Sequence, residues 1–328
     1  MKELKGLPGT DQATIIQQGS DNTAKKSGTA SASGQATQYL IYKDRAYTLF
    51  NYSASSAEAY AEALNGFKAA VDKDVHVYSK LVPTAAEFME AEKYQELSDS
   101  QKSAFEHING LLDSGIGRID VYGALQQHIS EDVYFRTDHH WTALGAYYAY
   151  VNLMDVMGEE AVPLSSYSTG KIENFLGSSY KATLSFRLKM HPDTITYYPP
   201  FAESTYTRHL TTGKAVSGKV VNPDYAKANN GFYAVFLGGD FPWGEIETDE
   251  RNDKRIAVVK DSYGNALIPF LIPHFETVYY VDPRYYNGNL TDFVQEHQVT
   301  DVLFLNNSTA ARTMGIAQLI DGLVGNTK

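Results

Sequence analysis

The chain alternates short apolar runs with segments of helical periodicity. The apolar runs are almost continuous, which is typical of strands that are buried on both faces of a sheet. They lie at residues 75–82, 118–122, 255–259, 277–282 and 301–306. Segments with helical spacing lie at 56–71, 84–112, 123–129, 141–157, 265–272, 290–297 and 308–324. The alternation predicts an α/β fold of three layers, with about five parallel strands between two layers of helices.

Three regions depart from this alternation. Residues 1–37 are rich in Gly, Ser, Thr and Ala and lack apolar periodicity, so we expect a disordered tail or linker there. Residues 38–53 hold two β-prone runs around a polar Lys-Asp-Arg turn, which predicts a hairpin. Residues 158–250 are rich in Tyr, Thr, Ser and Gly. We interpret them as a β-rich insertion that projects from an α/β domain spanning 38–328.

Composition narrows the possible functions. Asp and Glu number 39 against 28 Lys and Arg, so the formal net charge of −11 disfavours nucleic acid as a partner. The sequence contains no run of 18 apolar residues, so it predicts no membrane span. The absence of Cys excludes disulfides, thiolate metal sites and a Cys nucleophile. Tyr is abundant at 24 residues, and its flat ring with a polar tip suits either sugar ligands or ordinary packing.

Ser262 is the clearest candidate nucleophile. It follows the apolar run 255–259 and precedes the helical segment 265–272, so it lies on a strand-to-helix turn. Such a turn lifts a hydroxyl clear of the sheet and aims the free N–H groups of the next helix at a developing oxyanion. The alternative is a serine that only caps the helix.

A second cluster, Asp138-His139-His140-Trp141, precedes the helical segment 141–157. Residues two apart on an extended segment point to the same side, so Asp138 can orient His140 as a base. Two other interpretations remain open: Asp138 caps the following helix, or the cluster binds a metal. His191, His209 and His274 are the further ligands available, but they have no recognisable metal-site spacing.

The segments TDHHWTALGAYYAY, KDSYGNALIPFLIPHF and VDPRYY together resemble the DHHW family of bacterial proteins. That family is similar to the SGNH-hydrolase-like proteins of alginate O-acetylation, which carry an Asp-x-His-Trp motif followed much later by an Asp-Ser pair. The resemblance covers residues from about 38 to the C-terminus. It implies an SGNH-hydrolase-like fold with Ser262 as nucleophile, His140 as base and Asp138 as orienting carboxylate.

The resemblance also implies a function. It indicates an O-acetyltransferase or acetylesterase that acts on a cell-surface or extracellular polysaccharide, without a cofactor or metal. A transferase of this kind would receive its acyl group through a membrane acyltransferase partner. The expected location is extracellular or at the cell envelope, with the export signal absent from this sequence, because the start MKELKGLPGT has no apolar core. A non-catalytic glycan-binding or assembly protein and a metal hydrolase are the competing hypotheses.

Other residues are candidates for substrate or oxyanion contacts. His139 is expected to face away from His140, toward the helix or the substrate. Arg284, after the run 277–282, is a candidate partner for a glycan carboxylate or the oxyanion. Gly239, beside Gly238 and Asp240, ends a strand-like run and offers an N–H. The remaining candidates are Trp141, Tyr263 and Asn306 near the site, and Tyr197, Tyr198 and Tyr206 as sugar-stacking residues in the insertion.

Overall fold

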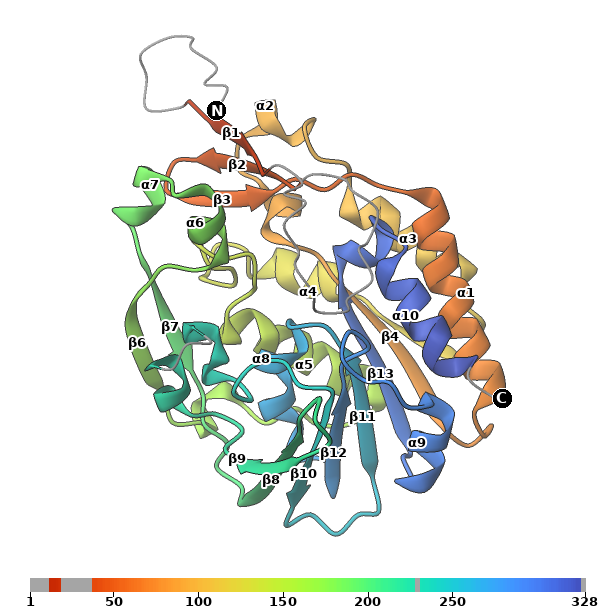
Figure 1. Ribbon diagram of the computed structural model, residues 1–328. Coiled ribbons are helices and arrows are strands. Elements are labelled where there is room, and N and C mark those ends of the chain that lie inside the picture. The colour runs from red at the N-terminus through yellow and green to blue at the C-terminus, as the bar shows by residue number, and fades with distance from the viewer. Residues whose placement is uncertain (1–11, 19–36, 228–230, 326–328) are drawn as a thin grey trace.

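The computed structural model describes residues 12–18, 37–227 and 231–325. Its centre is an eight-stranded sheet in the order β5-β4-β13-β11-β12-β10-β8-β9 (Figure 1). The first five of these strands pair in parallel. They are β5 (Ile116–Ile119), β4 (His76–Val82), β13 (Asp301–Asn307), β11 (Arg255–Lys260) and β12 (Thr277–Val281). The sheet is mixed, because its other three strands run antiparallel to their neighbours.

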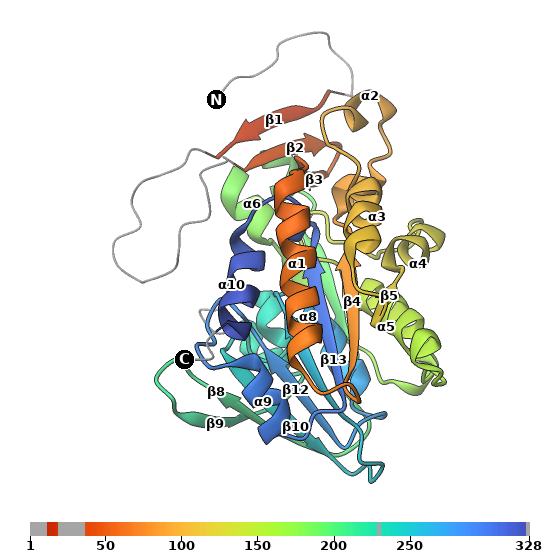
Figure 2. The same ribbon diagram turned by 90° about the vertical axis from the view of Figure 1, so that its right-hand side faces the viewer.

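Helices cover both faces of the sheet (Figures 1 and 2). One apolar core lies between the sheet and α1 (Ala54–Ala70), α3 (Gln101–Leu111), α9 (Leu290–Glu296) and α10 (Gly315–Val324). The other lies beneath α4 (Val121–Gln127), α5 (Ala143–Met157) and α8 (Gly264–Leu267). The strands between them are almost wholly apolar because both of their faces are buried.

The region 158–250 is less separate than the sequence predicts. Its strands β8 (Ser204–His209), β9 (Ala215–Gly218) and β10 (Trp243–Thr248) continue the main sheet beyond β12. An uncovered β12 would leave a row of unpaired backbone groups, and β10 satisfies them by antiparallel pairing. Only β6 (Gly170–Phe175) and β7 (Asp193–Tyr197) form a sheet of their own, and between them lie α6 (Ser178–Thr183) and α7 (Phe186–Lys189).

A small three-stranded sheet lies beyond the carboxyl ends of the parallel strands (Figure 2). Strands β2 (Gln38–Tyr42) and β3 (Arg45–Thr48) form the predicted hairpin. Strand β1 (Thr14–Gln17) pairs antiparallel with β2, so this part of the predicted tail is ordered by backbone pairing and not by apolar periodicity. Residues 1–11 and 19–36 of that tail lie outside the described residues.

Several element boundaries differ from the predicted ones. The apolar run at 118–122 divides into the end of β5 and the start of α4, because the Asp120 side chain accepts a hydrogen bond from Gly123 N–H and caps the helix. The segment 84–112, expected to hold one or two helices, contains the short helix α2 (Glu92–Gln95) and α3. In the part of the chain that the structure describes, no helix has the length and apolar character needed to cross a bilayer.

Candidate active site

Ser262 lies in the turn that joins β11 to α8, at the carboxyl end of the parallel strands. The turn is closed by Gly264 N–H donating to Asp261 O and Asn265 N–H donating to Ser262 O. A Cβ at Gly264 would lie 2.7 Å from Lys260 Cβ, so only glycine lets the helix begin this close to the strand. The side chain of Ser262 is half-buried, which leaves its hydroxyl within reach of a ligand.

The segment with the two histidines is a loop that leads into α5. Tyr134 and Trp141 pair across it, and Phe135 N–H donates to His140 O. The helix is capped by Thr142, whose Oγ1 accepts from Gly145 N–H. The interpretation of Asp138 as the helix cap is therefore wrong, because Thr142 takes that position.

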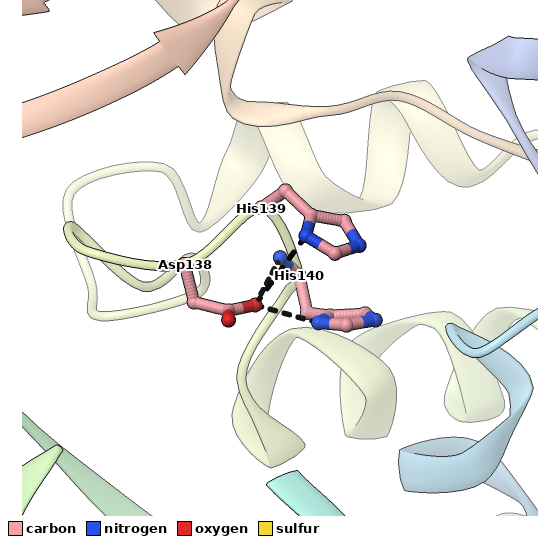
Figure 3. Close-up of side chains that lie close together, drawn as sticks. All are labelled: Asp138, His139 and His140. Carbon is pink, nitrogen blue, oxygen red and sulfur yellow. Dashed lines mark hydrogen bonds and ion pairs between the residues drawn. The ribbon is translucent and has the colours of Figure 1, made fainter. Parts of the chain in front are cut away.

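Ser262, His140 and Asp138 form one continuous line of hydrogen bonds. His140 Nε2 lies 2.7 Å from Ser262 Oγ. On the other side of the ring, His140 Nδ1 lies 2.6 Å from Asp138 Oδ1, as Figure 3 shows. Asp138 Oδ1 also accepts from His140 N–H at 2.9 Å. The carboxylate thus holds both the ring and the backbone of the residue that contacts the serine.

Asp138 is buried, and burial alone would raise its pKa. The charge and hydrogen bond of His140 outweigh that effect and hold the pKa of Asp138 well below its usual range. Asp138 Oδ2 accepts from Ser178 N–H at 2.7 Å. A Cβ at the preceding Gly177 would lie 2.3 Å from Asp138 Cβ, so glycine is required for this close approach. Nothing in the sequence marked Gly177 or Ser178 as part of the site.

His139 does not face away from His140, as alternation along an extended strand predicted. The two rings lie 3.9 Å apart, centre to centre, at 35° (Figure 3). The loop bends at this point, so successive side chains no longer alternate. His139 Nδ1 lies 2.5 Å from Ser178 Oγ. Burial, assisted by the nearby His140, lowers the pKa of His139 to about 4, so the ring is neutral near pH 7.

Tyr233 is a second ring against His140, and the sequence analysis missed it. Their centres are 3.9 Å apart and their planes differ by 8°. Two rings whose centres both lie this close to one imidazole cannot share a face, so His140 is held between Tyr233 and His139. Tyr233 comes from the short 3₁₀ turn Phe232–Val235, in a stretch predicted to be a strand. The orientation of His140 is therefore fixed by packing as well as by Asp138.

A network of buried and half-buried charges lies next to the turn that carries Ser262. Lys260 is fully buried, and its Nζ lies 3.0 Å from Asp240 Oδ1 and 3.2 Å from Asp282 Oδ2. Arg284 bonds to both oxygens of Asp282 and lies 2.9 Å from Asp240 Oδ2. Asn265 also donates to Asp240. Asp240 is thus an internal charge partner, while the candidate Arg284 keeps a third of its side chain exposed.

Candidate oxyanion donors differ from the predicted ones. Gly239 N–H donates to Phe236 O at 3.2 Å, so it is not free to bind an oxyanion. The backbone N–H of Ser262 has no acceptor among the described residues. It lies on the same residue as the candidate nucleophile, which is the usual place for one donor of an oxyanion hole.

Three further candidates are buried and cannot contact a substrate from their positions. Trp141 and Tyr263 have no exposed side-chain surface. Trp141 Nε1 donates to Tyr263 O at 3.0 Å, and Tyr263 Oη donates to His139 O, so these residues join the two loops of the site. Asn306 accepts from Tyr60 Oη at 2.9 Å behind the site. All three side chains are covered by the surrounding fold, Trp141 and Tyr263 between the two loops and Asn306 in β13.

The three tyrosines of the insertion that are candidates for sugar stacking differ in burial. Tyr206 is buried and cannot stack on a sugar, whereas Tyr197 and Tyr198 are partly exposed, so stacking by these two stays a prediction. Tyr206 is buried and bonds to Tyr280 Oη and Leu237 O. Tyr197 lies against Gly170 of the neighbouring strand, and Tyr198 contacts Phe270. These three side chains pack the fold, which accounts for part of the Tyr excess.

Asp138, His139 and His140 also meet a geometric criterion for a metal site, since one ligand atom from each lies within 4.8 Å of the others. Both oxygens of Asp138 and both ring nitrogens of His140 already have hydrogen-bond partners. His209 stacks on Trp243, and His274 bonds to Tyr150 Oη, so neither adds a ligand to the group. A metal here would have to replace the hydrogen bonds just described.

Comparisons with known proteins agree with the sequence motifs. A DHHW family protein from Eubacterium siraeum is 32% identical with a TM-score of 0.79, over 90% of this chain and 98% of its own. Bacillus cereus PatB1, solved with a sulfonyl adduct, is 19% identical with a TM-score of 0.70, over 85% of this chain and 96% of its own. It shares the fold.

The O-acetyltransferase domain of Pseudomonas putida AlgJ is 12% identical over 89% of this chain and 92% of its own, but its TM-score of 0.40 is too low to carry an argument. No curated protein matches the chain. The family described as DHHW protein matches residues 13–281, which include both loops of the candidate site. The chain therefore belongs to the DHHW protein family.

Proposed function

We propose that this protein is a serine-dependent acyl-transfer enzyme, an O-acetyltransferase or acetylesterase that acts on a cell-surface or extracellular polysaccharide. The observation that carries the proposal is the unbroken hydrogen-bond line from Ser262 through His140 to Asp138. We also propose that the parallel part of the sheet is an SGNH-hydrolase-like core, with Ser262 at the carboxyl end of β11.

In the first half-reaction, His140 Nε2 accepts the Ser262 hydroxyl proton as Oγ attacks an ester carbonyl carbon. Asp138 accepts a hydrogen bond from His140 Nδ1–H, stays ionised and stabilises the imidazolium that forms. The pKa of Asp138 lies well below its usual range, so its carboxylate is ionised when this happens. Electron density moves from the carbonyl bond to its oxygen and gives a tetrahedral oxyanion. The Ser262 N–H is the donor available to that oxyanion.

Collapse of the tetrahedral species breaks the bond to the leaving alcohol, which takes the proton from His140. The product is an ester between the acyl group and Ser262 Oγ. A sugar hydroxyl then attacks this ester while His140 again accepts the proton, which gives a second tetrahedral oxyanion. Its collapse breaks the bond to Ser262 Oγ, which takes the proton back from His140, and the acyl group stays on the glycan. Water in the place of the sugar gives hydrolysis.

The neutral His139 is placed to assist the second half-reaction. Its ring is partly exposed beside His140, and Ser178 fixes its orientation. Its Nε2 would bind an acceptor hydroxyl without introducing a positive charge, since its pKa is about 4. Arg284, held by Asp282 and Asp240 and one-third exposed, would meet an anionic group of the substrate.

Polysaccharide as the substrate, a membrane acyltransferase as the acyl donor and a location at the cell envelope rest on the family resemblance. A different candidate function is a non-catalytic glycan-binding protein that retains the fold. A metal hydrolase is favoured by one observation, the close group of Asp138, His139 and His140.

Turnover of a small acetyl ester distinguishes these functions. The proposal expects turnover that is insensitive to a chelator and lost in Ser262→Ala. Turnover that a chelator abolishes and Ser262→Ala retains would favour the metal hydrolase. If neither ester hydrolysis nor acetyl transfer to an oligosaccharide occurs, with an acetyl donor and acceptor supplied, the binding protein is the better account.

A further inference from the structure

The segment 184–190 carries an unusual surface. Leu184, Phe186 and Met190 expose 73%, 72% and 58% of their area, the three highest values for large hydrophobic residues in the described part of the chain. We call these three residues the apolar patch. Isolated exposed hydrophobic residues are common, but a group within seven residues is a marker of an interaction surface.

Burial of the neighbouring residue Leu188 fixes the outward orientation of the apolar patch. Leu188, in the same short helix α7, is fully buried against Ile41 and Ala46 of the small N-terminal sheet. In a helix, residues 186 and 190 lie on one side and residue 188 lies on the opposite side. Burial of Leu188 therefore turns Phe186 and Met190 toward solvent. Figure 1 shows α7 beside β2 and β3 at the outer edge of the molecule.

Leu184 adopts a conformation that its residue type disfavours. Its φ of 50° lies in the left-handed region, at the position that ends α6, where glycine or asparagine is usual. Leu184 N–H closes the helix on Tyr180 O. A bulky apolar side chain here has a cost in backbone strain and gains no burial in return. An exposed, strained leucine is expected where its side chain binds something outside the molecule.

The charge around the apolar patch is opposite to that of the whole protein. Lys181, Arg187 and Lys189 are exposed, and no Asp or Glu occurs between residues 174 and 192. The complete chain carries a net charge of −11. Arg187 Nη1 donates to Gln12 O, so we consider Lys181 and Lys189 as the exposed cations beside the patch. A partner that matches this surface has negative charges for the lysines to contact and an apolar interior for the apolar patch to enter.

We propose that the apolar patch and its lysines rest on the surface of an anionic lipid bilayer. Leu, Phe and Met side chains would enter the boundary between headgroups and acyl chains, while Lys181 and Lys189 would contact the phosphates. A protein partner is the less fitting occupant, because the core of a protein–protein interface is usually a larger, closely packed apolar area than these three side chains provide. The proposal is independent of the chemistry at Ser262. It does place that site near the bilayer, because α6 begins at Ser178, which bonds to Asp138 and His139.

Sedimentation of the full chain with lipid vesicles tests the proposal. We expect binding to phosphatidylcholine vesicles that contain phosphatidylglycerol, and much weaker binding to phosphatidylcholine alone. The triple variant Leu184→Asn/Phe186→Gln/Met190→Gln should reduce the affinity for anionic vesicles at least about tenfold. Leu184→Asn suits the left-handed backbone, so the fold should survive, and the thermal unfolding midpoint verifies it.

Two further variants complete the experiment. Lys181→Gln/Lys189→Gln should weaken binding to anionic vesicles and remove its dependence on salt. Val156→Ser, which alters an exposed apolar side chain on α5, should bind as the wild type does. The proposal is wrong if the wild type does not bind anionic vesicles, or if the folded triple variant binds them equally well.

Discussion

The imidazole Nε2 of His140 lies 2.7 Å from the hydroxyl oxygen of Ser262, although 122 residues separate them in the chain. The two residues come from different loops, one before α5 and one after β11. These loops are fastened together by Trp141 Nε1, which donates to Tyr263 O, and by Tyr263 Oη, which donates to His139 O. The separation is that of a hydrogen bond ready for proton transfer.

Ser262→Ala and His140→Ala should each lower kcat for a small acetyl ester by about 10³-fold or more, because the serine needs the base to become nucleophilic. The double variant should be little worse than either single variant, since the two groups act as one unit. Steady-state kinetics measure all three. Additive losses in the double variant would indicate that the two residues act separately.

Asp138→Asn should also lower kcat for the acetyl ester severely. An amide cannot stabilise the imidazolium of His140 and can hold the ring in the wrong tautomer, so kcat should fall by about 10³- to 10⁴-fold. His139→Ala is the matched control from the same loop and should cost much less. If His139→Ala is the inactive variant and His140→Ala is active, the base has been assigned to the wrong histidine.

Part of this site was predictable from the sequence and part was not. The strand-to-helix turn at Ser262 depends on local pattern and is present. The Asp138–His140 contact is also present, but on a bent loop and not on the extended segment from which it was predicted. Burial of Trp141 and Tyr263 depends on how two distant loops pack, which local pattern does not contain.

The supporting residues show the same limit. Tyr233 and Gly177 reach the site from the region interpreted as a projecting insertion, and neither lies in a motif. The parallel strands have continuous apolar runs, which are readily recognised. β10 and β8 belong to the same sheet, but their mixed composition reflects an edge that is only partly covered.

Gly177→Ala should reduce activity about 10- to 100-fold, because displacement of a catalytic group by about 1 Å can have an effect of this size. The new methyl group would lie 2.3 Å from Asp138 Cβ and would force the carboxylate away from His140. Gly110→Ala is the matched control, since a Cβ at that helical position meets nothing within 4 Å. Equal activity of the two variants would show that the position of Asp138 tolerates the shift.

Lys260→Met should destabilise the fold by about 3 kcal/mol, because the fully buried Asp282 and the largely buried Asp240 lose one of two cations and are left with Arg284. Urea unfolding followed by fluorescence measures the change. Lys102→Met removes an exposed ion pair with Glu106 and should cost less than about 1 kcal/mol. A Lys260→Met protein as stable as Lys102→Met would show that Arg284 alone balances the two carboxylates.

The lowered pKa of His139 predicts that the stability of the fold depends on pH. The folded state lowers its pKa to about 4, while the unfolded chain keeps the ordinary value of 6.5. Between these values the unfolded chain binds the proton and the folded chain does not. The free energy of unfolding should therefore fall as the pH decreases from about 6.5 to about 4.

His139→Gln should weaken this dependence, which urea unfolding at about pH 7 and about pH 5 would reveal. The effect is moderated because the ring is 39% exposed and water screens its interactions. An unchanged pH dependence in the variant would place the proton uptake on other groups.

Covalent labelling of Ser262 tests the central claim most directly. The wild-type protein is treated with an aryl sulfonyl fluoride, digested and mapped by mass spectrometry. Attack by Ser262 Oγ on sulfur expels fluoride, passes the hydroxyl proton to His140 and leaves one sulfonyl ester. The account predicts a single adduct on Ser262 that is lost in Ser262→Ala and strongly slowed in His140→Ala, with His139→Ala still labelled. Labelling elsewhere, or none on a folded wild-type protein, would contradict the account.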